Sequence, residues 1–410
     1  MERKHAFLVI AVSAAYALLL ILFFYTRASS SSPTNESKSQ MDAMFVESEL
    51  PSMPRSDHVI PHLAYLISGS KGDLDRLWRT LQALYHPANQ YVVHLDLESP
   101  AAERLELVMR VEKEPIFAKV GNVHTMFKAN LVTYRGPTMI TNTLQAMAFL
   151  LNRSKEWDWF INLSASDYPL VTQDDILYTF SYLPRNLNFI EHTSNLGWKE
   201  VKRAKPIIID PGLYMSTKSD IVWLTQTREL PTAFKLFTGS AWMALSRAFV
   251  EYCVWGWDNL PRTMLMYHAN FVSSPEGYFQ TLICNAPEFA RTAVNHDLHY
   301  ISWDVPPRQH PHTLGSKDVA RMVGSRAPFA RKFNHRDPVL DMIDAKLLGR
   351  RMGSFSPGGW CSGIPPCSAT RESYHLQPGP GAVRLASLID GVVRSGWYVE
   401  NQCKLRSKPG

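Results

Sequence analysis

Short apolar runs and amphipathic segments alternate along the chain from about residue 61 onward. Four runs have the length and the apolar character of buried strands: 63–68, 91–96, 116–120 and 159–163. Between them, apolar residues recur at three- and four-residue spacing, which is typical of helices that pack on one face, in segments 74–84, 101–111 and 138–151. Strands that alternate with helices in this way predict an α/β fold with a mostly parallel sheet.

Polar residues follow three of the predicted strands, at 68–71, at Asp96 and at 164–167. Because ligands of open α/β sheets bind outside the carboxyl ends of the strands, we expect these residues to line one crevice. A nucleotide is the first ligand to consider there. The alternative is that Asp96 and Asp167 only turn or cap the chain, as aspartate often does in loops. The sequence contains neither a dinucleotide fingerprint nor a GxxxxGK[ST] phosphate loop.

The second half of the chain is less regular. Residues 237–247 indicate a strand, in which Gly239 allows another backbone to approach closely. Trp242 in this segment could stack on a sugar ring or pack in the core. Glu276 follows a proline in the first turn of a predicted helix, where the helix dipole keeps a carboxylate ionised, as a catalytic base requires. An ordinary glutamate at a helix start is the alternative.

Composition and charge narrow the function classes. The chain has 410 residues, is 45% hydrophobic and carries a net charge of +6, which excludes a disordered, collagen-like or multi-span membrane protein. The positive charge is spread along the sequence, which argues against nucleic acid as a partner but leaves nucleotide phosphates open. Basic residues are denser between 308 and 332, where they could neutralise a diphosphate or form an ordinary solvated surface.

The N-terminal segments indicate the compartment. The apolar run 6–25 follows a basic start and is long enough to span a bilayer, longer than the apolar region of most cleavable signals. We therefore expect a cytosolic tail at 1–5, a transmembrane anchor at 6–26 and a Ser/Pro-rich stem at 27–58. Basic residues before the span predict that the rest of the chain is lumenal. A cleaved signal peptide is the alternative.

Two further features matter in a secretory compartment. Five cysteines could form disulfides there, and the odd number leaves at least one unpaired or intermolecular; the spacing does not reveal the pairing of Cys253, Cys284, Cys361, Cys367 and Cys403. Three sequons are candidate glycosylation sites, at Asn35, Asn152 and Asn162. Of these, Asn162 closes an apolar strand and could be buried.

Several segments match one known family in the same order. They are 64–67, 83–87, 91–96, 161–170, 237–247, Pro275-Glu276 and 329–333. Together they resemble the core-2/I-branching β-1,6-N-acetylglucosaminyltransferases and peptide O-xylosyltransferases, glycosyltransferase family 14. The plant Golgi β-glucuronosyltransferases that act on arabinogalactan are the most similar branch. The resemblance implies a GT-A-like catalytic domain at 59–345, followed by a cysteine-containing extension at 346–410.

The resemblance also implies roles for single residues in an inverting reaction. Glu276 falls on the catalytic glutamate of the family and would deprotonate the acceptor hydroxyl. Asp96 matches the position that binds uridine. Lys332 matches a cation that assists departure of UDP, and Arg308 is a looser match for a second such cation. Two residues, Trp242 and Glu191, fall near acceptor-contacting positions.

The sequence is consistent with catalysis without a metal. Segment 164–167 has a single carboxylate where metal-using GT-A enzymes usually present Asp-x-Asp, the spacing that grips a divalent cation. Segment 73–75 fits that pattern, but it lies at a helix start, where capping is the expected role. We therefore expect no metal and no cofactor, with the UDP-sugar as a substrate and cationic side chains stabilising the leaving diphosphate.

The leading hypothesis is a Golgi membrane enzyme that moves glucuronic acid from UDP-glucuronate to β-linked galactan of arabinogalactan proteins. One alternative keeps the class but transfers xylose or N-acetylglucosamine. Another is a catalytically silent lumenal protein that binds carbohydrate, although the presence of Glu276 and Lys332 argues against it. A glucuronate donor carries a carboxylate that needs a cation, and Lys199, Lys202 and Arg203 are candidates by charge alone.

Overall fold

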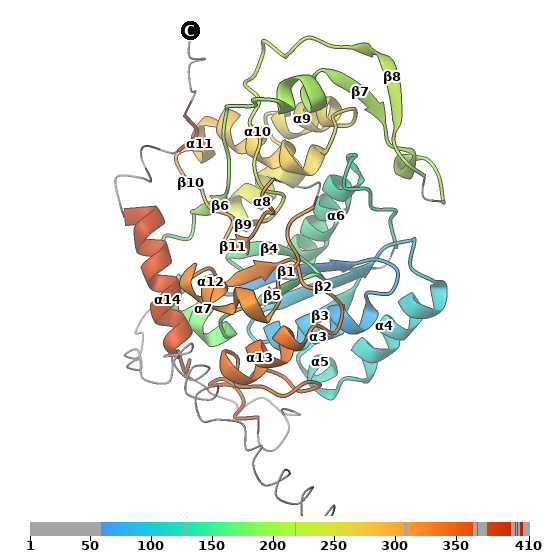
Figure 1. Cartoon of the computed structure of the whole chain (residues 1–410). Helices are drawn as coiled ribbons and strands as arrows, with labels where there is room; N and C mark the ends of the chain where they lie inside the picture. Colours follow the sequence, from blue (N-terminus) through green and yellow to red (C-terminus); the bar gives the residue numbers. More distant parts are fainter. Residues whose placement is uncertain are drawn as a thin grey trace, which may run out of the picture. The chain divides into compact units, whose positions relative to one another are not determined.

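A computed structural model describes most of the chain beyond the predicted stem (Figure 1). The described residues are 59–126, 128–217, 219–306, 310–363, 367, 375–394, 398, 400 and 402–404. The predicted tail, anchor and stem lie outside them, as do the sequon Asn35 and Arg308. Within the described ranges, no helix combines the length and the apolar character needed to cross a membrane.

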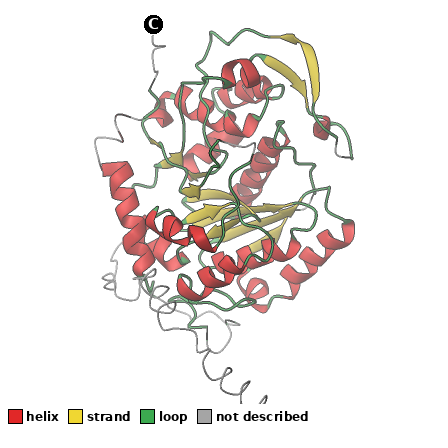
Figure 2. Ribbon diagram, viewed as in Figure 1, coloured by secondary structure: helices red, strands yellow, loops and turns green. Residues whose placement is uncertain are grey.

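A seven-stranded sheet lies at the centre of the described part (Figures 1 and 2). Its strands, in spatial order, are β10 (Ala293–Val294), β6 (Asn188–Ile190), β9 (Met243–Ser246), β4 (Trp159–Ser164), β1 (Leu63–Gly69), β2 (Gln90–Leu95) and β3 (Val123–Thr125). The strands pair in parallel except β9, which runs antiparallel to β4 and to β6. The predicted mostly parallel α/β sheet is therefore confirmed.

Alternate side chains of the central strands enter two hydrophobic cores. Tyr65 and Ile67 of β1 point to one side of the sheet, whereas Ala64 and Leu66 point to the other. Since both faces are buried, the strand is apolar at every position from Leu63 to Ile67 instead of alternating. The first core is covered by α3 (Leu74–Leu84), α4 (Ala101–Lys113), α5 (Pro115–Val120), α7 (Gln173–Ser181) and α14 (Pro380–Ile389). The second is covered by α6 (Thr138–Arg153), α8 (Arg247–Trp255), α9 (Leu260–His268), α10 (Tyr278–Asn285) and α11 (Pro287–Ala290).

The strand predicted at 116–120 is wrong, because these residues form α5. Pro115 occupies the first turn, where its missing N–H costs nothing, and Gly121 ends the helix with a φ of 70° in the left-handed region. Ile116 and Phe117 are buried as one face of a short helix. The strand in this part of the chain is β3, which follows α5 and begins at Val123. A short apolar run alone does not separate these two possibilities.

Smaller elements complete the body. A three-stranded sheet joins β11 (His299–Ile301), β12 (Phe329–Arg331) and β5 (Asp167–Pro169). A separate hairpin pairs β7 (Pro206–Ile209) with β8 (Val222–Thr227), and it lies at the periphery beside α9 (Figure 1). The remaining helices are η2 (Glu200–Ala204), η3 (Pro211–Leu213), η4 (Ser274–Glu276), η5 (Ser316–Asp318), α12 (Val319–Gly324), α13 (Pro338–Lys346) and η6 (Asp390–Arg394).

The C-terminal extension shares the core of the catalytic body. Trp360 and Leu385 belong to the same buried cluster as β1. The Asp174 carboxylate of α7 accepts hydrogen bonds from the backbone N–H groups of Gly359 at 2.7 Å and Gln377 at 2.6 Å. The predicted boundary at residue 345 therefore does not separate two cores.

Four of the five cysteines are paired. The Cys284–Cys403 disulfide links α10 to the end of the extension, whereas Cys361–Cys367 closes a short loop within the extension. Cys253 is buried and forms no disulfide. The expectation that the odd number would leave one cysteine unpaired is thus confirmed.

Candidate active site

The polar strand ends predicted to converge do lie together. Ser68 at the end of β1 is in register with Ser164 at the end of β4. The backbone N–H of Asp96, directly after β2, donates to the carbonyl of Gly69 at 3.0 Å. Three parallel strands thus end side by side, which is the edge where open α/β sheets bind ligands.

Asp96 is held firmly at this edge. It is 2% exposed, and its Oδ1 accepts hydrogen bonds from the Ser70 hydroxyl at 2.9 Å and the Glu98 N–H at 3.2 Å. It therefore orders the turn after β2, while its match to a uridine-binding position stays a prediction. Nearby, Asp73 directly precedes α3 as expected, but its side chain makes no capping hydrogen bond to the helix. Its Oδ2 instead accepts a hydrogen bond from the Ser70 N–H at 2.9 Å, so the expected capping role is corrected.

An arginine whose side chain is 13% exposed faces Asp167 at the same edge. Arg331 of β12 lies opposite Asp167 of β5 in the antiparallel register, with Nε 3.5 Å from Oδ1. The other oxygen, Oδ2, accepts the Ser164 N–H at 2.7 Å. The Arg331 guanidinium also lies 4.0 Å from the ring centroid of Trp242. Among the residues that the structure describes, neither Nε nor Nη1 of Arg331 makes a hydrogen bond, and because Nε faces Asp167 Oδ1, Nη1 is the one left without a polar partner. Groups left in this way are candidates to meet a ligand.

Lys332 is brought to the same place. Its neighbour Phe333 donates its N–H to the carbonyl of Ser166 at 3.0 Å, which fixes this segment against the loop after β4. The Lys332 carbonyl accepts the Leu314 N–H at 2.8 Å. Lys332 is half-buried. Because Arg308 lies outside the described residues, its predicted role stays a prediction.

Glu276 is the centre of a second group of polar side chains. It ends the short helix η4, so the predicted helical turn after Pro275 is present, and α10 follows at Tyr278. Glu276 Oε2 accepts hydrogen bonds from Lys199 Nζ at 3.1 Å and from Arg203 Nη1. Oε1 accepts a hydrogen bond from the Tyr134 hydroxyl at 2.9 Å. Three donors thus fix both oxygens of one carboxylate.

The charges around Glu276 keep it ionised. Its side chain is 15% exposed, and this burial acts to raise its pKa, but the neighbouring Arg203 and Lys199 cations outweigh burial and hold the pKa below its usual value. Although 43% of Tyr134 is exposed, desolvation of its phenol group, followed by the adjacent Glu276 carboxylate, raises its pKa, so this phenol stays a hydrogen-bond donor. The arrangement keeps the carboxylate ionised, as a base must be to accept a proton, although the lowered pKa also weakens its basicity.

Glu191 lies close to Glu276 because Gly239 joins their backbones. The Gly239 N–H donates to the Glu276 carbonyl at 2.9 Å, and a Cβ at this glycine would lie 1.7 Å from the Glu191 carbonyl oxygen. The predicted close approach at Gly239 is therefore confirmed. Although Glu191 reaches solvent, partial burial of its carboxyl group, followed by the negative charges of Asp297 and Glu276, raises its pKa to about 7. Lys199 opposes that rise.

Trp242 offers little surface to a ligand. It is 6% exposed and lies between the Arg331 guanidinium and the His299 ring, whose centroid is 5.8 Å away. The alternative of core packing therefore describes this side chain better than stacking on a sugar. What Trp242 does is hold Arg331 in place.

The two described sequons differ. Asn152 is exposed near the end of α6, as a glycosylation site requires. Asn162 is 2% exposed, its amide donates to the Ala241 carbonyl at 2.9 Å, and its Oδ1 accepts the Met243 N–H at 3.0 Å. Both ends of this amide are used between β4 and β9, so the prediction of a glycan at Asn162 is corrected.

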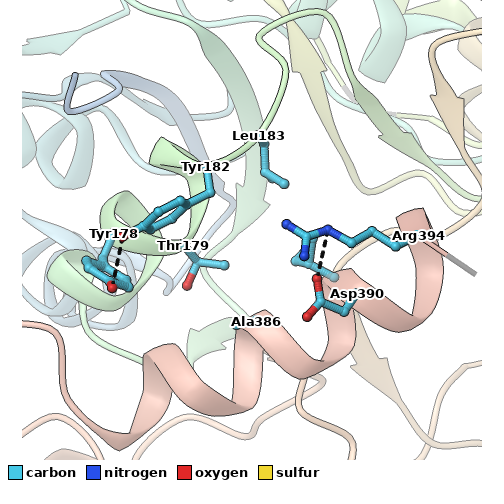
Figure 3. Close-up of a pocket in the computed structure, with 8 residues that line it drawn as sticks. Tyr178, Thr179, Tyr182, Leu183, Ala386, Asp390 and Arg394 are labelled. Carbon is cyan, nitrogen blue, oxygen red and sulfur yellow. Dashed lines mark hydrogen bonds and ion pairs between the residues drawn. The ribbon is translucent and has the colours of Figure 1, made fainter. Parts of the chain in front are cut away.

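A cavity of about 200 Å³ lies elsewhere, between α7 and α14 (Figure 3). Figure 3 shows the Asp390–Arg394 ion pair and the Tyr182–Tyr178 hydrogen bond at its wall. None of the candidate site residues lines it. The cavity is therefore not the candidate active site, which lies where the polar side chains converge.

Two site residues were missed by the sequence analysis. Tyr134 lies in an irregular segment that shows no periodicity, so nothing local could have found it. Arg331 stands beside Lys332 in segment 329–333, and its burial next to Asp167 depends on the pairing of β12 with β5. The one local signal for Arg331 was its positive charge directly beside Lys332, the lysine predicted to bind phosphate.

Comparisons with known proteins agree with this picture. The family model of the Core-2/I-Branching enzymes matches residues 63–323. Beta-glucuronosyltransferase GlcAT14A of Arabidopsis thaliana is 60% identical over 366 residues, which cover 88% of this chain and 82% of that protein. GlcAT14B of the same plant is 62% identical over 347 residues, covering 83% and 80%. The apo structure of mouse xyloside xylosyltransferase 1 aligns at a TM-score of 0.32 and 12% identity, over 66% of this chain and 96% of that one, and at that score it carries no argument.

Proposed function

The chain belongs to the Core-2/I-Branching enzyme family, and from this membership we propose that it is a β-glucuronosyltransferase that uses UDP-glucuronate and a β-linked galactan acceptor. The observation that carries the assignment is an identity of 60% to 62% with two β-glucuronosyltransferases over at least four fifths of their length. The geometry around Glu276 supports a transferase, because it holds one ionised carboxylate where a hydroxyl group can be deprotonated.

Glu276 acts as the base in a single displacement. It removes the proton from the acceptor hydroxyl as the hydroxyl oxygen attacks the anomeric carbon of the donor. The bond to UDP breaks on the opposite face, so the configuration at the anomeric carbon inverts. Tyr134, Lys199 and Arg203 fix the direction of the carboxylate, which reduces the cost of ordering it during the reaction.

Cations at the strand ends stabilise the departing diphosphate. Lys332 and Arg331 lie beside the loop after β4, and the N–H groups of Arg331 Nη1 suit phosphate or carboxylate oxygens. Asp167 faces the Arg331 cation, an environment that disfavours a second cation at that carboxylate. We therefore propose catalysis without a metal. Of the earlier candidates for the donor carboxylate, Lys199 and Arg203 bind Glu276, and Lys202 is exposed. Arg331, which was not among those candidates, is the cation we propose for this role.

The enzyme is proposed to work at the Golgi membrane as a single-pass type II protein with a lumenal catalytic domain. The apolar run at 6–25 supports an anchor, and the two disulfides fit an oxidising compartment. Protease treatment of sealed Golgi vesicles should leave the body of the chain intact. Digestion of the body without detergent would contradict the lumenal orientation.

A donor screen tests the function. The full-length chain is offered UDP-glucuronate, UDP-xylose or UDP-N-acetylglucosamine with β-linked galacto-oligosaccharides, and products are detected by mass. We expect a product heavier by one glucuronic acid residue, and activity that persists in excess chelator. Transfer of xylose or N-acetylglucosamine instead would overturn the donor assignment. Activity lost with chelator and restored by Mn²⁺ would overturn catalysis by cationic side chains alone.

A further inference from the structure

Two tryptophans beside the candidate site keep large rings in solvent. Trp198, just before η2, is 63% exposed, and Trp223 of β8 is 47% exposed. By contrast, Trp159 at the centre of the sheet is fully buried. Exposed apolar surface of this kind often marks a binding site, so the surroundings of the two rings decide what they could bind.

Trp198 is linked to Glu276 through an arginine, whereas Trp223 is linked to it through the Tyr134–Arg135 segment. The Arg203 guanidinium, which donates to the Glu276 carboxylate, lies 5.0 Å from the centroid of the Trp198 ring. The Arg135 guanidinium lies 5.6 Å from the Trp223 ring. Tyr134, which precedes Arg135 in the sequence, also donates a hydrogen bond to the Glu276 carboxylate. Trp198 therefore contacts a side chain that binds the Glu276 carboxylate, and Trp223 contacts the sequence neighbour of a second such side chain, Tyr134.

The hairpin turns Trp223 toward the body. In the β7–β8 register Trp223 is paired with Ile208, which is fully buried, whereas the next pair, Ile209 with Val222, lies on the other face and is exposed. Because successive side chains of a strand alternate between faces, the Trp223 ring shares the inner face with Ile208. Figure 1 shows this hairpin beside α9, at the end of the molecule that also carries η2.

A sugar chain fits such a pair of rings. A guanidinium on one face of an indole fixes the ring through a cation–π contact and leaves the remainder of its surface for a ligand. In β-galactose the axial O4 leaves the C–H groups of C3, C4 and C5 together on one apolar face, which matches a flat aromatic ring. Neighbouring galactose units also carry hydroxyl groups that can form hydrogen bonds with polar groups beside the rings.

We propose that Trp198 and Trp223 form an acceptor platform that binds galactose units beyond the unit that receives glucuronic acid. This inference rests on the proposed function and names the part of the acceptor that the enzyme recognises away from the reacting atoms. Its consequence is a preference for longer chains, because only an acceptor that extends past Glu276 reaches both rings.

The test compares acceptors of increasing length. Initial rates of the full-length wild-type chain and of Trp198→Ala, Trp223→Ala and the double variant are measured with β-galactobiose and β-galactohexaose at saturating UDP-glucuronate. We expect each single change to lower kcat/KM for the hexaose by about three- to tenfold, the size expected for one exposed aromatic contact. The rate with galactobiose and the slow hydrolysis of UDP-glucuronate without acceptor should change less than twofold. Phenylalanine at either position should restore most of the loss.

A matched control separates the platform from general surface effects. Trp255 at the end of α8 is 56% exposed and has no contact with the Glu276 group in the described part of the chain, so Trp255→Ala should leave the length preference intact. Equal losses for short and long acceptors would overturn the proposal. A change in oligomeric state on gel filtration, with the length preference unchanged, would assign the rings to a contact between copies instead.

Binding without transfer distinguishes this proposal from the proposed function. Quenching of tryptophan fluorescence by β-galactohexaose is measured in the absence of donor, in wild type and in the double variant. Binding that the double variant loses, with no glucuronate transfer by wild type, would keep the platform and overturn the function. Transfer by wild type with a length preference that survives in the double variant would do the opposite.

Discussion

The two sides of the candidate site are built in different ways. The strand-end side, made of Asp96, Asp167, Arg331 and Lys332, follows regular strands whose pairing fixes each residue. The loop side, made of Tyr134, Lys199, Arg203 and Glu276, comes from three segments outside the strands and α-helices of the central sheet. The strand-end side is organised by the backbone, whereas the loop side is organised by side chains that meet on one carboxylate.

This difference indicates how the work is divided. A diphosphate is common to all donors of this class, and a rigid edge of parallel strands suits it. The acceptor is the variable partner, and loops with exposed rings can vary without disturbing the sheet. The loop side should therefore control the acceptor and the proton, while the strand-end side should control the donor and its leaving group.

The largest expected effect comes from the carboxylate at the centre of the loop side. Glu276→Gln keeps the size of the side chain and its ability to accept hydrogen bonds but removes the base, so kcat should fall by about 10²- to 10⁴-fold. The measurement is the initial rate of transfer at saturating donor and acceptor. Glu288→Gln, an exposed glutamate in α11, is the matched control and should retain activity. A variant at Glu276 that transfers at nearly the wild-type rate would show that the base is elsewhere.

A loss on the strand-end side should be somewhat smaller. Lys332→Ala removes a cation from the leaving diphosphate, and kcat should fall by about 10²-fold. The loss should be similar with short and long acceptors, because the strand-end side binds the donor and does not contact the acceptor chain. Lys317→Ala in η5 is an exposed control of the same type. If the fall in kcat of Lys332→Ala depended on acceptor length, the assignment of the donor to one side and the acceptor to the other would be contradicted.

The pH dependence should distinguish the two glutamates. Because the pKa of Glu276 is lowered, its ionised form persists below pH 4.5, and it should contribute no inflection near neutrality. The pKa of Glu191 is raised to about 7, so this group gains its charge as the pH rises through 7. We expect kcat/KM for the acceptor to rise several-fold through that range, as the charged carboxylate becomes a better acceptor for sugar hydroxyl groups. The inflection should disappear in Glu191→Gln; its persistence there would assign it to another group.

The smallest effect is expected far from both sides. Asn152→Gln should remove one glycan from protein made in a secretory host, with activity unchanged within twofold, because Asn152 is exposed near the end of α6. The measurement is the mass of the chain before and after enzymatic removal of N-glycans. Asn162→Gln should leave the glycan mass unchanged. Loss of a glycan in that variant would contradict the buried environment of Asn162.

Sequence periodicity predicted one side of the site better than the other. The strand-end side follows from apolar runs, since the ends of parallel strands meet wherever the runs end, and Asp96 and Asp167 were found in this way. The loop side depends on tertiary contacts: Glu276 was placed at a helix start from its own neighbours, but nothing local connects Tyr134 to it. Lys199 and Arg203 were noted only for their charge, and their contact with Glu276 requires η2 to fold against η4.

The errors have the same origin. Segment 116–120 became a helix because Pro115 and Gly121 set its ends, while its apolar character fitted either structure. Trp242 was expected near the acceptor, and the pairing of β12 with β5 instead brings Arg331 over its ring. In each case residues outside the pattern decided what the pattern left open: the flanking Pro115 and Gly121 for segment 116–120, and the distant Arg331 for Trp242.

The anomeric configuration of the product tests the central claim most directly. That claim is a single displacement, with Glu276 as the base on one side and cations receiving UDP on the other. UDP-glucuronate carries an α-linked sugar, so one displacement gives a β-linked product. Proton NMR of the initial product should show only the large coupling of a β-glucuronide. An α-linked initial product would mean retention of configuration and would contradict the account of a single catalytic carboxylate.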